Sequence, residues 1–372
     1  PAFYGVIQTF SRPSTMRPRN VISPLMQELS GYIAAARRRA LPAPVAEKTK
    51  HHVLDTLAAM VSGAKLLPGS KAIAYARTLG GVREATVVGT KLMTSAVNAA
   101  FANTMLAHAD ETDDSHAPSL THPGCGIVSA ALAMAERGGR SGPALLRAVA
   151  LGYDISARVS LSLQSGAFRS VGHSTHSIGP TFGATAAAAA LAGLNPNQVR
   201  HALSYAAQQA GGLSCYARDP EHIEKAFVFG GMPARNGVAA ATMVAAGFSA
   251  VEDVFSGERN FFVKFDESGR IGAAPRPERL LRDLGKTYEI MNTNIKRWSV
   301  GSPIQAPLDS LLALIRTGNL KADDVEKLTV RVSQTGANTT DNRDMPNICM
   351  QHLCAVMLSD GIVTFESAHD AS

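Results

Sequence analysis

Three histidines stand among acidic residues between His108 and Gly124, in the segment HADETDDSHAPSLTHPG. This segment separates two apolar stretches whose composition is typical of helices. Ionisable side chains are costly to bury unless they are paired, bind a metal or face a solvated pocket. A carboxylate beside an imidazole can also keep the imidazole pKa near neutrality, which suits proton transfer. The segment is therefore the first candidate for a functional site.

Three interpretations of this segment stay open from the residues alone. It could be a solvated loop whose histidines cap helices. It could bind a metal, although its spacing matches neither HExxH nor a calcium-binding loop. It could also do acid/base chemistry, in which carboxylates orient His122 and a partner elsewhere in the chain completes the site. We favour the acid/base interpretation and predict no metal.

A second histidine-containing segment, GHSTHSIG at residues 172–179, opens an alanine-rich stretch. The start of a helix attracts anions, so this segment could bind a carboxylate group. The alternative is that Ser174, Thr175 or Ser177 simply caps the helix. The segment supplies a candidate partner for His122.

Isolated cations stand at Lys225, Arg235 and Lys296, among apolar or glycine residues rather than in charge runs. Such residues are usually surface side chains whose stems lie on apolar neighbours, and less often they bind anions. An anion-binding role, or a lysine of lowered pKa, is therefore the alternative to a surface position for these three residues.

Composition narrows the function classes. The 372 residues are 45% hydrophobic and 18% charged, which is enough for real cores and argues against general disorder. The formal net charge is +6, but no basic cluster is interleaved with aromatic residues, so we expect small anions rather than nucleic acid as ligands. No dinucleotide-binding or phosphate-binding glycine motif is present.

The four cysteines contain no CxxC pair and no zinc spacing, so we expect free thiols in a reducing, cytoplasmic location. No apolar run reaches the roughly 20 residues that a membrane-spanning helix needs, so we expect no membrane association.

Apolar periodicity predicts a mainly α protein with helices over 127–136, 144–160, 196–209 and 307–316. Asn195 and Pro196 provide the start signal of the third of these. Alanine-rich helices at 183–193 and 237–247 are expected inside a bundle. Leu328, Val330 and Val332 alternate with polar residues and predict a strand. We divide the chain into a tail at 1–21, an all-helical domain at 22–291 and an α+β lid at 292–372.

Several blocks, taken in order, resemble the MmgE/PrpD family, which includes 2-methylcitrate dehydratase, cis-aconitate decarboxylase and iminodisuccinate epimerase. The blocks are HADETDDSH with THPG, then GHSTHSIG, EKAFVFGGMPARNG, NIKRWSVGSP and QHLCAVMLSDG. By this resemblance His122 matches the family's catalytic histidine, and His173 matches a second histidine position. Lys225 and Lys296 match lysines of the later blocks.

Together, the residues and the resemblance predict a set of site residues. Catalytic roles are predicted for His122, His173, Lys225, Asp113 and Asp114. Substrate binding is predicted for Glu111, Ser115, His116, Arg235, Lys296 and His352. In this hypothesis His122 moves a proton, Asp113 or Asp114 orients it, and His173 or His352 protonates a leaving hydroxyl.

The chain departs from the family pattern at a few positions. Ser174 replaces a proline, Val228 and Gly301 each replace a histidine, and His352 replaces a tyrosine. One extra residue is needed before Gly237 to keep the blocks aligned. Because Gly301 stands where decarboxylase and dehydratase members have a catalytic histidine, we rank decarboxylation of cis-aconitate lower.

The resemblance implies a large helical domain, a smaller α+β lid, a cleft between them, a homodimer, and no metal or organic cofactor. It implies a lyase of the dehydratase type that acts on a small di- or tricarboxylate; an epimerase, isomerase or decarboxylase is the alternative, and a non-catalytic binding protein is disfavoured. Family chains continue beyond the final block, so we expect the closing helices to be missing here or the sequence to be incomplete.

Overall fold

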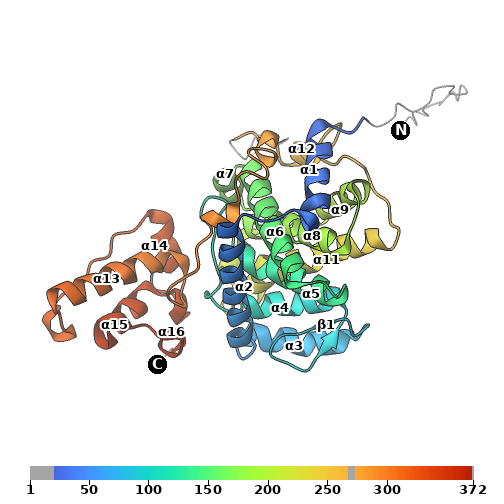
Figure 1. Cartoon of the computed structure of the whole chain (residues 1–372). Helices are drawn as coiled ribbons and strands as arrows, with labels where there is room; N and C mark the ends of the chain where they lie inside the picture. The colour runs from blue at the N-terminus through green and yellow to red at the C-terminus, as the bar shows by residue number, and fades with distance from the viewer. Residues whose placement is uncertain (1–20, 267–272, 371–372) are drawn as a thin grey trace, which may run out of the picture.

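The structure is a computed structural model that describes residues 21–266 and 273–370. The described chain is mainly helical, as predicted, with one small two-stranded sheet (Figure 1). In that sheet β1 (Ala85–Thr86) pairs antiparallel with β2 (Met93–Thr94), with Ala85 opposite Thr94. The predicted tail at 1–21 lies, apart from Val21, outside the described residues.

Helices form most of the described chain between residues 21 and 266. The α-helices there are α1 (Pro24–Ala35), α2 (Ala43–Gly63), α3 (Leu67–Leu79), α4 (Ala96–Ala107), α5 (Pro123–Arg137), α6 (Gly142–Ser162), α7 (Ser165–Ser170), α8 (Thr175–Ala192), α9 (Pro196–Gln208), α10 (Ile223–Ala226), α11 (Met232–Ala245) and α12 (Phe261–Asp266). Their buried side chains form one core that runs from Met26 to Ile290. We call this part the helical body.

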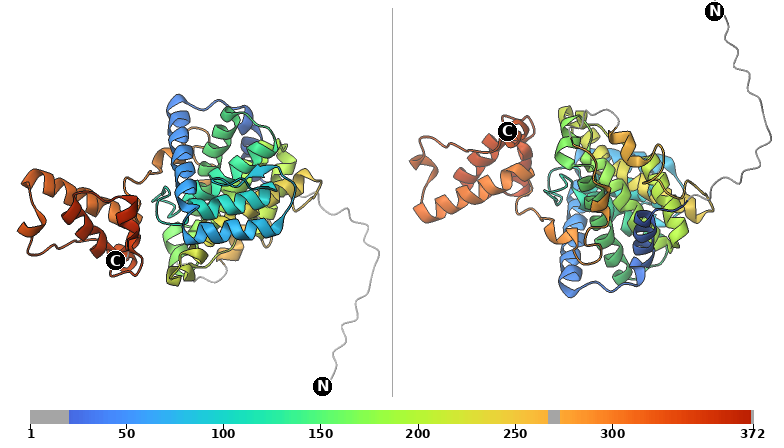
Figure 2. Two further views of the ribbon diagram at one scale, coloured as in Figure 1. Left: turned by 90° about the horizontal axis from the view of Figure 1, so that it is seen from below. Right: turned by 90° about the horizontal axis from the view of Figure 1, so that it is seen from above.

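The C-terminal unit, residues 298–370, has a separate hydrophobic core that begins at Trp298 and ends at Ala368. It contains α13 (Gln305–Gly318), α14 (Gln334–Thr340), α15 (Met350–Asp360) and α16 (Phe365–His369). Figures 1 and 2 show this unit, in orange and red, beside the helical body. The core of the helical body ends at Ile290 and that of the C-terminal unit begins at Trp298; the domain boundary near residue 291 stays a prediction.

Helix α8 lies at the centre of the helical body, between α6 and α11. Every residue from Thr175 to Leu191 is buried, as expected for an alanine-rich interior helix. Close approach depends on glycine: a Cβ on Gly183 would lie 2.5 Å from the carbonyl oxygen of Gly152 on α6. A Cβ on Gly237 of α11 would lie 2.6 Å from the Ala184 Cβ. Small residues therefore bring the backbones together.

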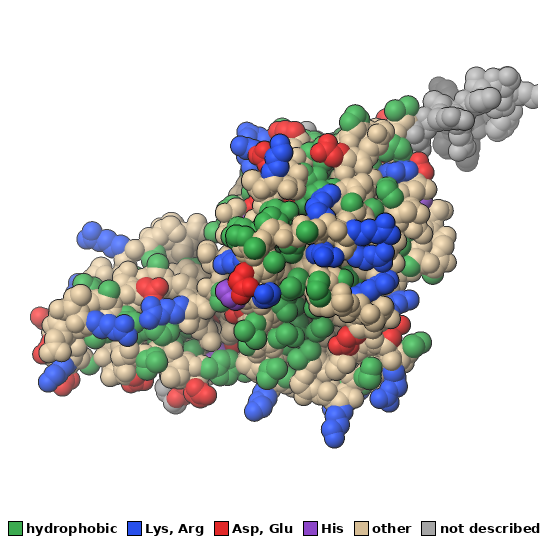
Figure 3. All heavy atoms as spheres, viewed as in Figure 1, with side chains coloured by type: hydrophobic (Ala, Val, Ile, Leu, Met, Phe, Trp, Pro, Cys, Tyr) green, Lys and Arg blue, Asp and Glu red, His purple; other side chains and the backbone are tan. Residues whose placement is uncertain are grey.

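A local start signal predicted the beginning of α9 correctly, whereas α5, α8 and α11 begin four to eight residues before the predicted positions. At α9, Asn195 and Gln198 form a capping box, and Pro196 is the first helical residue, as predicted. On helix α2, Leu54 and Val61 are 68% and 57% exposed, whereas His52 is buried. Figure 3 shows apolar side chains gathered on the face of the helical body that carries α2.

The strand predicted around Leu328, Val330 and Val332 is wrong. Residues 327–333 form neither helix nor strand, and these three apolar side chains are 36–38% exposed. An alternating pattern gives a strand only where a neighbouring backbone completes the hydrogen bonds, and no described residue does so here. The regular elements that the structure describes in the C-terminal unit are all helices, so the predicted α+β character of the lid finds no support there. None of the described helices combines the length and apolar character that crossing a membrane requires.

Candidate active site

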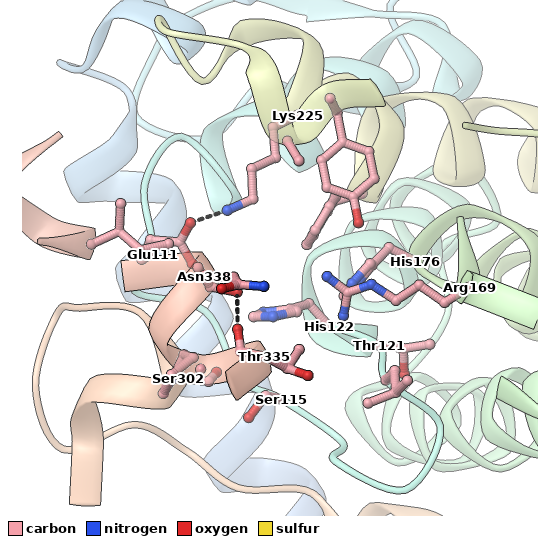
Figure 4. Close-up of a pocket in the computed structure, with 18 of the residues that line it drawn as sticks. Glu111, Ser115, Thr121, His122, Arg169, His176, Lys225, Ser302, Thr335 and Asn338 are labelled. Carbon is pink, nitrogen blue, oxygen red and sulfur yellow. Dashed lines mark hydrogen bonds and ion pairs between the residues drawn. The ribbon is translucent and has the colours of Figure 1, made fainter. Parts of the chain in front are cut away.

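A cavity of about 410 Å³ lies where the helical body faces the C-terminal unit (Figure 4). The helical body supplies most of its ionisable lining, and the C-terminal unit supplies hydroxyls, an amide and one arginine. The lining includes Glu111, Ser115, His116, Thr121, His122, Arg169, His176, Tyr216, His222, Lys225, Phe229, Ser302, Thr335, Asn338 and Arg343. Of the predicted residues, the structure brings Glu111, Ser115, His116, His122 and Lys225 to this cavity.

His122 is placed at the cavity wall by the start of α5. It is the N-cap residue of that helix, yet its side chain makes no capping hydrogen bond. The oxygen Oδ1 of Asp114 accepts from the Gly124 backbone N–H instead, at 2.9 Å. Because another residue caps the helix, the His122 imidazole is free to lie in the cavity wall, where it is 9% exposed.

Asp113 holds the inner nitrogen of His122. The distance from His122 Nδ1 to Asp113 Oδ1 is 3.2 Å, and His108 Nδ1 lies 2.9 Å from the same oxygen. A carboxylate can only accept, so we assign the proton of neutral His122 to Nδ1, which leaves a lone pair on Nε2. The Lys296 ammonium is a further neighbour of this carboxylate, 3.9 Å from Asp113 Oδ1.

Burial and charge set the protonation states of this pair. Burial alone would raise the pKa of Asp113, but His108 and His122 hold it well below its usual range. Burial lowers the pKa of His122 below 6.5, although the Asp113 charge opposes this. At neutral pH the structure thus pairs a carboxylate with a neutral imidazole, which is the state that a general base requires.

Asp114 was predicted to act in catalysis, but it does not line the cavity. Its oxygen Oδ2 is 2.6 Å from His52 Nδ1 and accepts from the Tyr153 hydroxyl at 2.6 Å. Its other oxygen caps α5 at Gly124. A Cβ on Gly124 would lie 2.8 Å from Asp114 Oδ1, so only glycine allows this approach. Asp114 acts as the buried anchor that fixes the start of α5.

Glu111 and Lys225 form an ion pair at the cavity wall (Figure 4). Burial alone would raise the pKa of Glu111, but Lys225 and His222 hold it well below its usual range. Lys296 lies behind this wall: its side chain is 2% exposed and donates to the backbone oxygen of Glu111 at 2.5 Å. Both predicted lysines therefore already have anionic neighbours within the protein.

Ser115 and His116 close the lower part of the same wall. The backbone of Ser115 pairs with Asn294, which ties the loop to the connection between the two units. His116 lies 2.6 Å from the Ser119 hydroxyl through Nδ1 and 3.1 Å from Glu289 through Nε2. Both ring nitrogens of His116 are thus occupied, so it is suited to shaping the cavity.

His173, Arg235 and His352 do not reach the cavity, and their predicted positions there are wrong. His173 stacks on Phe168, with ring centroids 4.4 Å apart, and its backbone pairs with Leu213. Arg235 is exposed and hydrogen-bonds the Asn236 side chain. His352 lies 2.9 Å from the Ser367 backbone oxygen within the C-terminal unit. The side chain of each of these three residues contacts neighbouring residues outside the cavity.

His176, three residues after His173, occupies the cavity instead. It lies in the first turn of α8, where it stacks on Phe229 with ring centroids 3.7 Å apart. Its Nδ1 is buried with no hydrogen-bond partner among the described residues. Burial holds the pKa of His176 well below its usual range, with the His122 charge acting in the same direction.

Comparison with known proteins identifies the family of this chain. Residues 27–271 match the MmgE/PrpD N-terminal domain, which covers most of the chain. The chain belongs to the MmgE/PrpD family. It is also 29% identical over 283 residues to a protein of Aspergillus oryzae (strain ATCC 42149 / RIB 40) described as cis-aconitate decarboxylase-like protein oryM. That similarity covers 72% of this chain and 57% of the relative, so the chain spans little more than half of that protein.

The segment in which one extra residue was predicted before Gly237 contains an irregular helical turn. Residues Phe227–Gly231 form a π-helical turn, η3, between α10 and α11. A π-turn accommodates one additional residue without ending the helix. It places Phe229 between two imidazoles, stacked on His176 and, at 4.4 Å, on His108. Val228, which replaces a family histidine, is buried beside Tyr216 and Phe229.

Gly301, which replaces another family histidine, lies next to the cavity-lining Ser302. Its N–H donates to the Asn347 backbone oxygen at 2.9 Å. A Cβ there would lie 3.0 Å from a side-chain carbon of Ile348, so the C-terminal unit packs tightly against this position. Among the described residues, no imidazole from this segment reaches the cavity.

Sequence reasoning missed His176, Tyr216, His222, Arg169 and Arg343. A signal existed only for His176, which belongs to the quoted GHSTHSIG segment. The other residues sit on short turns, and their direction depends on how those turns pack. Arg169, for example, lies on the six-residue helix α7, whose buried anchor is Phe168.

Cys125 joins His108 and Asp113 in a group whose possible metal ligand atoms lie within 4.8 Å of one another. Hydrogen bonds explain this group without a metal. His108 is already bonded to Asp113, and the Cys125 thiol lies 3.3 Å from the His122 backbone oxygen. Burial, together with Asp113, raises the pKa of Cys125 well above its usual range, so its thiolate is disfavoured.

Proposed function

We propose that this MmgE/PrpD protein is a cofactor-independent lyase of the dehydratase type that acts on a small di- or tricarboxylate. One observation supports the proposal most: neutral His122 lies in the wall of a cavity, held from behind by the buried carboxylate of Asp113. Family membership supports an enzyme of this general class.

In the proposed reaction, Nε2 of His122 removes a proton from the carbon beside a substrate carboxylate. The charge that develops on that carboxylate needs cationic neighbours, and the Lys225 ammonium lies at the cavity wall with one of its donors taken by Glu111. The bond from the neighbouring carbon to its hydroxyl then breaks. The departing hydroxide takes the proton back from His122 and leaves as water, so the histidine returns to its neutral state.

The alternatives share the same proton removal. Return of a proton to the opposite face would give an epimerase or isomerase, and loss of carbon dioxide would give a decarboxylase. The name of the Aspergillus oryzae relative favours the decarboxylase, whereas Gly301 in place of a histidine disfavours it. A homodimer and a cytoplasmic location also stay proposals; the exposed Leu54 and Val61 on α2 offer apolar surface that a second copy could cover.

The reaction type can be tested by incubating the protein with a panel of hydroxy-polycarboxylates in deuterated water. We expect one substrate to lose water and to give the ultraviolet absorbance of a carbon–carbon double bond conjugated to a carboxylate. Solvent deuterium without net conversion would indicate the epimerase, and release of carbon dioxide the decarboxylase. No reaction across the panel would contradict the proposal and favour a binding protein.

The pH dependence of the reaction should report the lowered pKa of His122. Only the neutral imidazole can accept a proton, and burial extends that form to pH values below 6.5. We therefore expect kcat/KM to fall on the acid side with a midpoint below 6.5. Asp113→Asn removes the negative charge that favours imidazolium, so the midpoint should fall further. A wild-type midpoint above 6.5 would contradict this assignment.

A further inference from the structure

The cationic side chains of the cavity are not equivalent. Lys225 is paired with Glu111, and Lys296 lies behind the wall beside Asp113. The Arg169 side chain lines the cavity, and its guanidinium forms no hydrogen bond or ion pair with another described residue; the backbone oxygen of Arg169 accepts from the Gly172 N–H. Figure 4 shows its guanidinium directed into the open space beside His122 and His176. Arg169 is therefore a charge without a counterion next to the proposed base.

A second arginine comes from the C-terminal unit. Arg343 belongs to the C-terminal unit and lines the same cavity. Its only described hydrogen bond runs to the backbone oxygen of Ala217, at 3.4 Å, and it has no carboxylate partner among the described residues. The two arginines thus face one cavity from two units that have separate hydrophobic cores.

The charges of the lining favour an anionic ligand. Its ionised side chains are Arg169, Lys225 and Arg343 against Glu111 and Asp219, which leaves one positive charge in excess. The cavity is partly apolar, because Phe229, Leu120 and Ile348 also line it. A guanidinium in such a place presents a planar pair of N–H donors that matches the two oxygens of a carboxylate.

We propose that Arg169 and Arg343 are the residues that bind the carboxylates of the substrate, one from each unit. In this arrangement Arg169 holds the carboxylate next to the carbon that His122 deprotonates, and Arg343 holds a second carboxylate. The substrate is thereby a dicarboxylate or a larger polycarboxylate that contacts both units. The choice of a carboxylate as ligand rests on the proposed function. The binding residues differ from Lys225, Lys296 and Arg235, which the sequence predicted.

The α7 turn explains how Arg169 is aimed. Gln164 begins the turn in the left-handed region, at φ 59°, and Phe168 is fully buried beneath it. Neighbouring residues on a helix point about 100° apart, so anchoring Phe168 turns Arg169 away from the core. His173 stacks on the other side of Phe168 and keeps the anchor in place. His173 thus supports the orientation of Arg169 without lining the cavity itself.

The test measures ligand binding to the full chain by calorimetry, with succinate as the dicarboxylate, butyrate as the monocarboxylate and succinamide as the uncharged analogue. Wild type should bind succinate more tightly than butyrate and should not bind succinamide. Arg169→Gln should weaken binding of both acids by about ten- to one-hundred-fold, because a hydrogen bond to a charged group is lost. Arg343→Gln should weaken only succinate binding. Arg169→Lys should give an intermediate affinity, since lysine keeps the charge without the fork.

Arg77→Gln is the matched control, because Arg77 is an exposed arginine on α3 outside the cavity. It should bind both acids as wild type does, and thermal unfolding should show that all variants remain folded. Unchanged succinate binding by Arg169→Gln, an equal loss in Arg77→Gln, or no carboxylate binding by wild type would each overturn the inference.

The proposed function can fail separately. If succinate binds through both arginines but no polycarboxylate reacts, the lyase proposal is wrong and the binding inference stands. If a polycarboxylate reacts and Arg169→Gln has wild-type KM, the binding inference is wrong and the lyase proposal stands.

Discussion

Replacing His122 by asparagine should lower turnover by about 10²- to 10⁴-fold, which is the usual contribution of a general base. The amide group of asparagine can still hydrogen-bond Asp113, so the variant removes the lone pair at Nε2 while it keeps the anchor. Succinate affinity should change little, because the proposed carboxylate ligands are arginines. The measurement is the rate of hydrogen exchange or product formation on the substrate that the panel identifies.

His51→Asn is the control for this variant. His51 lies on α2, its side chain is 58% exposed, and it contacts Glu47 outside the cavity. It should keep the wild-type rate. If His122→Asn retained more than about a tenth of the wild-type rate, which is far above the range for a lost general base, His122 would not be the base.

Replacing Asp114 by alanine should lower the free energy of unfolding by roughly 3–5 kcal/mol, as expected when one partner of a buried charged network is removed. The variant leaves His52 Nδ1, the Tyr153 hydroxyl and the Gly124 N–H without their acceptor, all in the interior. It also removes the cap of α5, so His122 should lose its fixed position and turnover should fall as well. Urea unfolding of the full chain measures the stability.

Glu28→Ala is the matched control, because Glu28 is an exposed carboxylate on α1 in the same helical body. Its unfolding midpoint should stay close to that of wild type. An Asp114→Ala variant as stable as Glu28→Ala would show that the Asp114 network does not hold the start of α5.

Helices and the start of α9 could be predicted from the sequence because their signals are local. The capping box of Asn195 and Gln198 and the interior alanines of α8 depend on neighbouring residues alone. The strand at Leu328–Val332 failed for the opposite reason, since a strand needs a partner that no local pattern reveals.

The site was only partly predictable, for a related reason. His122 and Asp113 were found because ionisable residues concentrate in one short segment. His173 and His176 are three residues apart, and only the packing of α7 and η3 decides which of them enters the cavity. Asp113 and Asp114 are adjacent carboxylates, and the sequence does not show which of them faces the cavity histidine and which caps a helix.

The sealed position of Asp113 has a consequence for isotopes. Asp113 is fully buried and lies 3.2 Å from Nδ1 of His122, and His108, which contacts the same carboxylate oxygen, is stacked on Phe229. We therefore expect a hydrogen taken up by Nε2 of His122 to return to the bound ligand, because the other ring nitrogen faces this buried carboxylate. In a dehydration, the water released would carry the hydrogen that the substrate lost, and solvent label would enter only between turnovers.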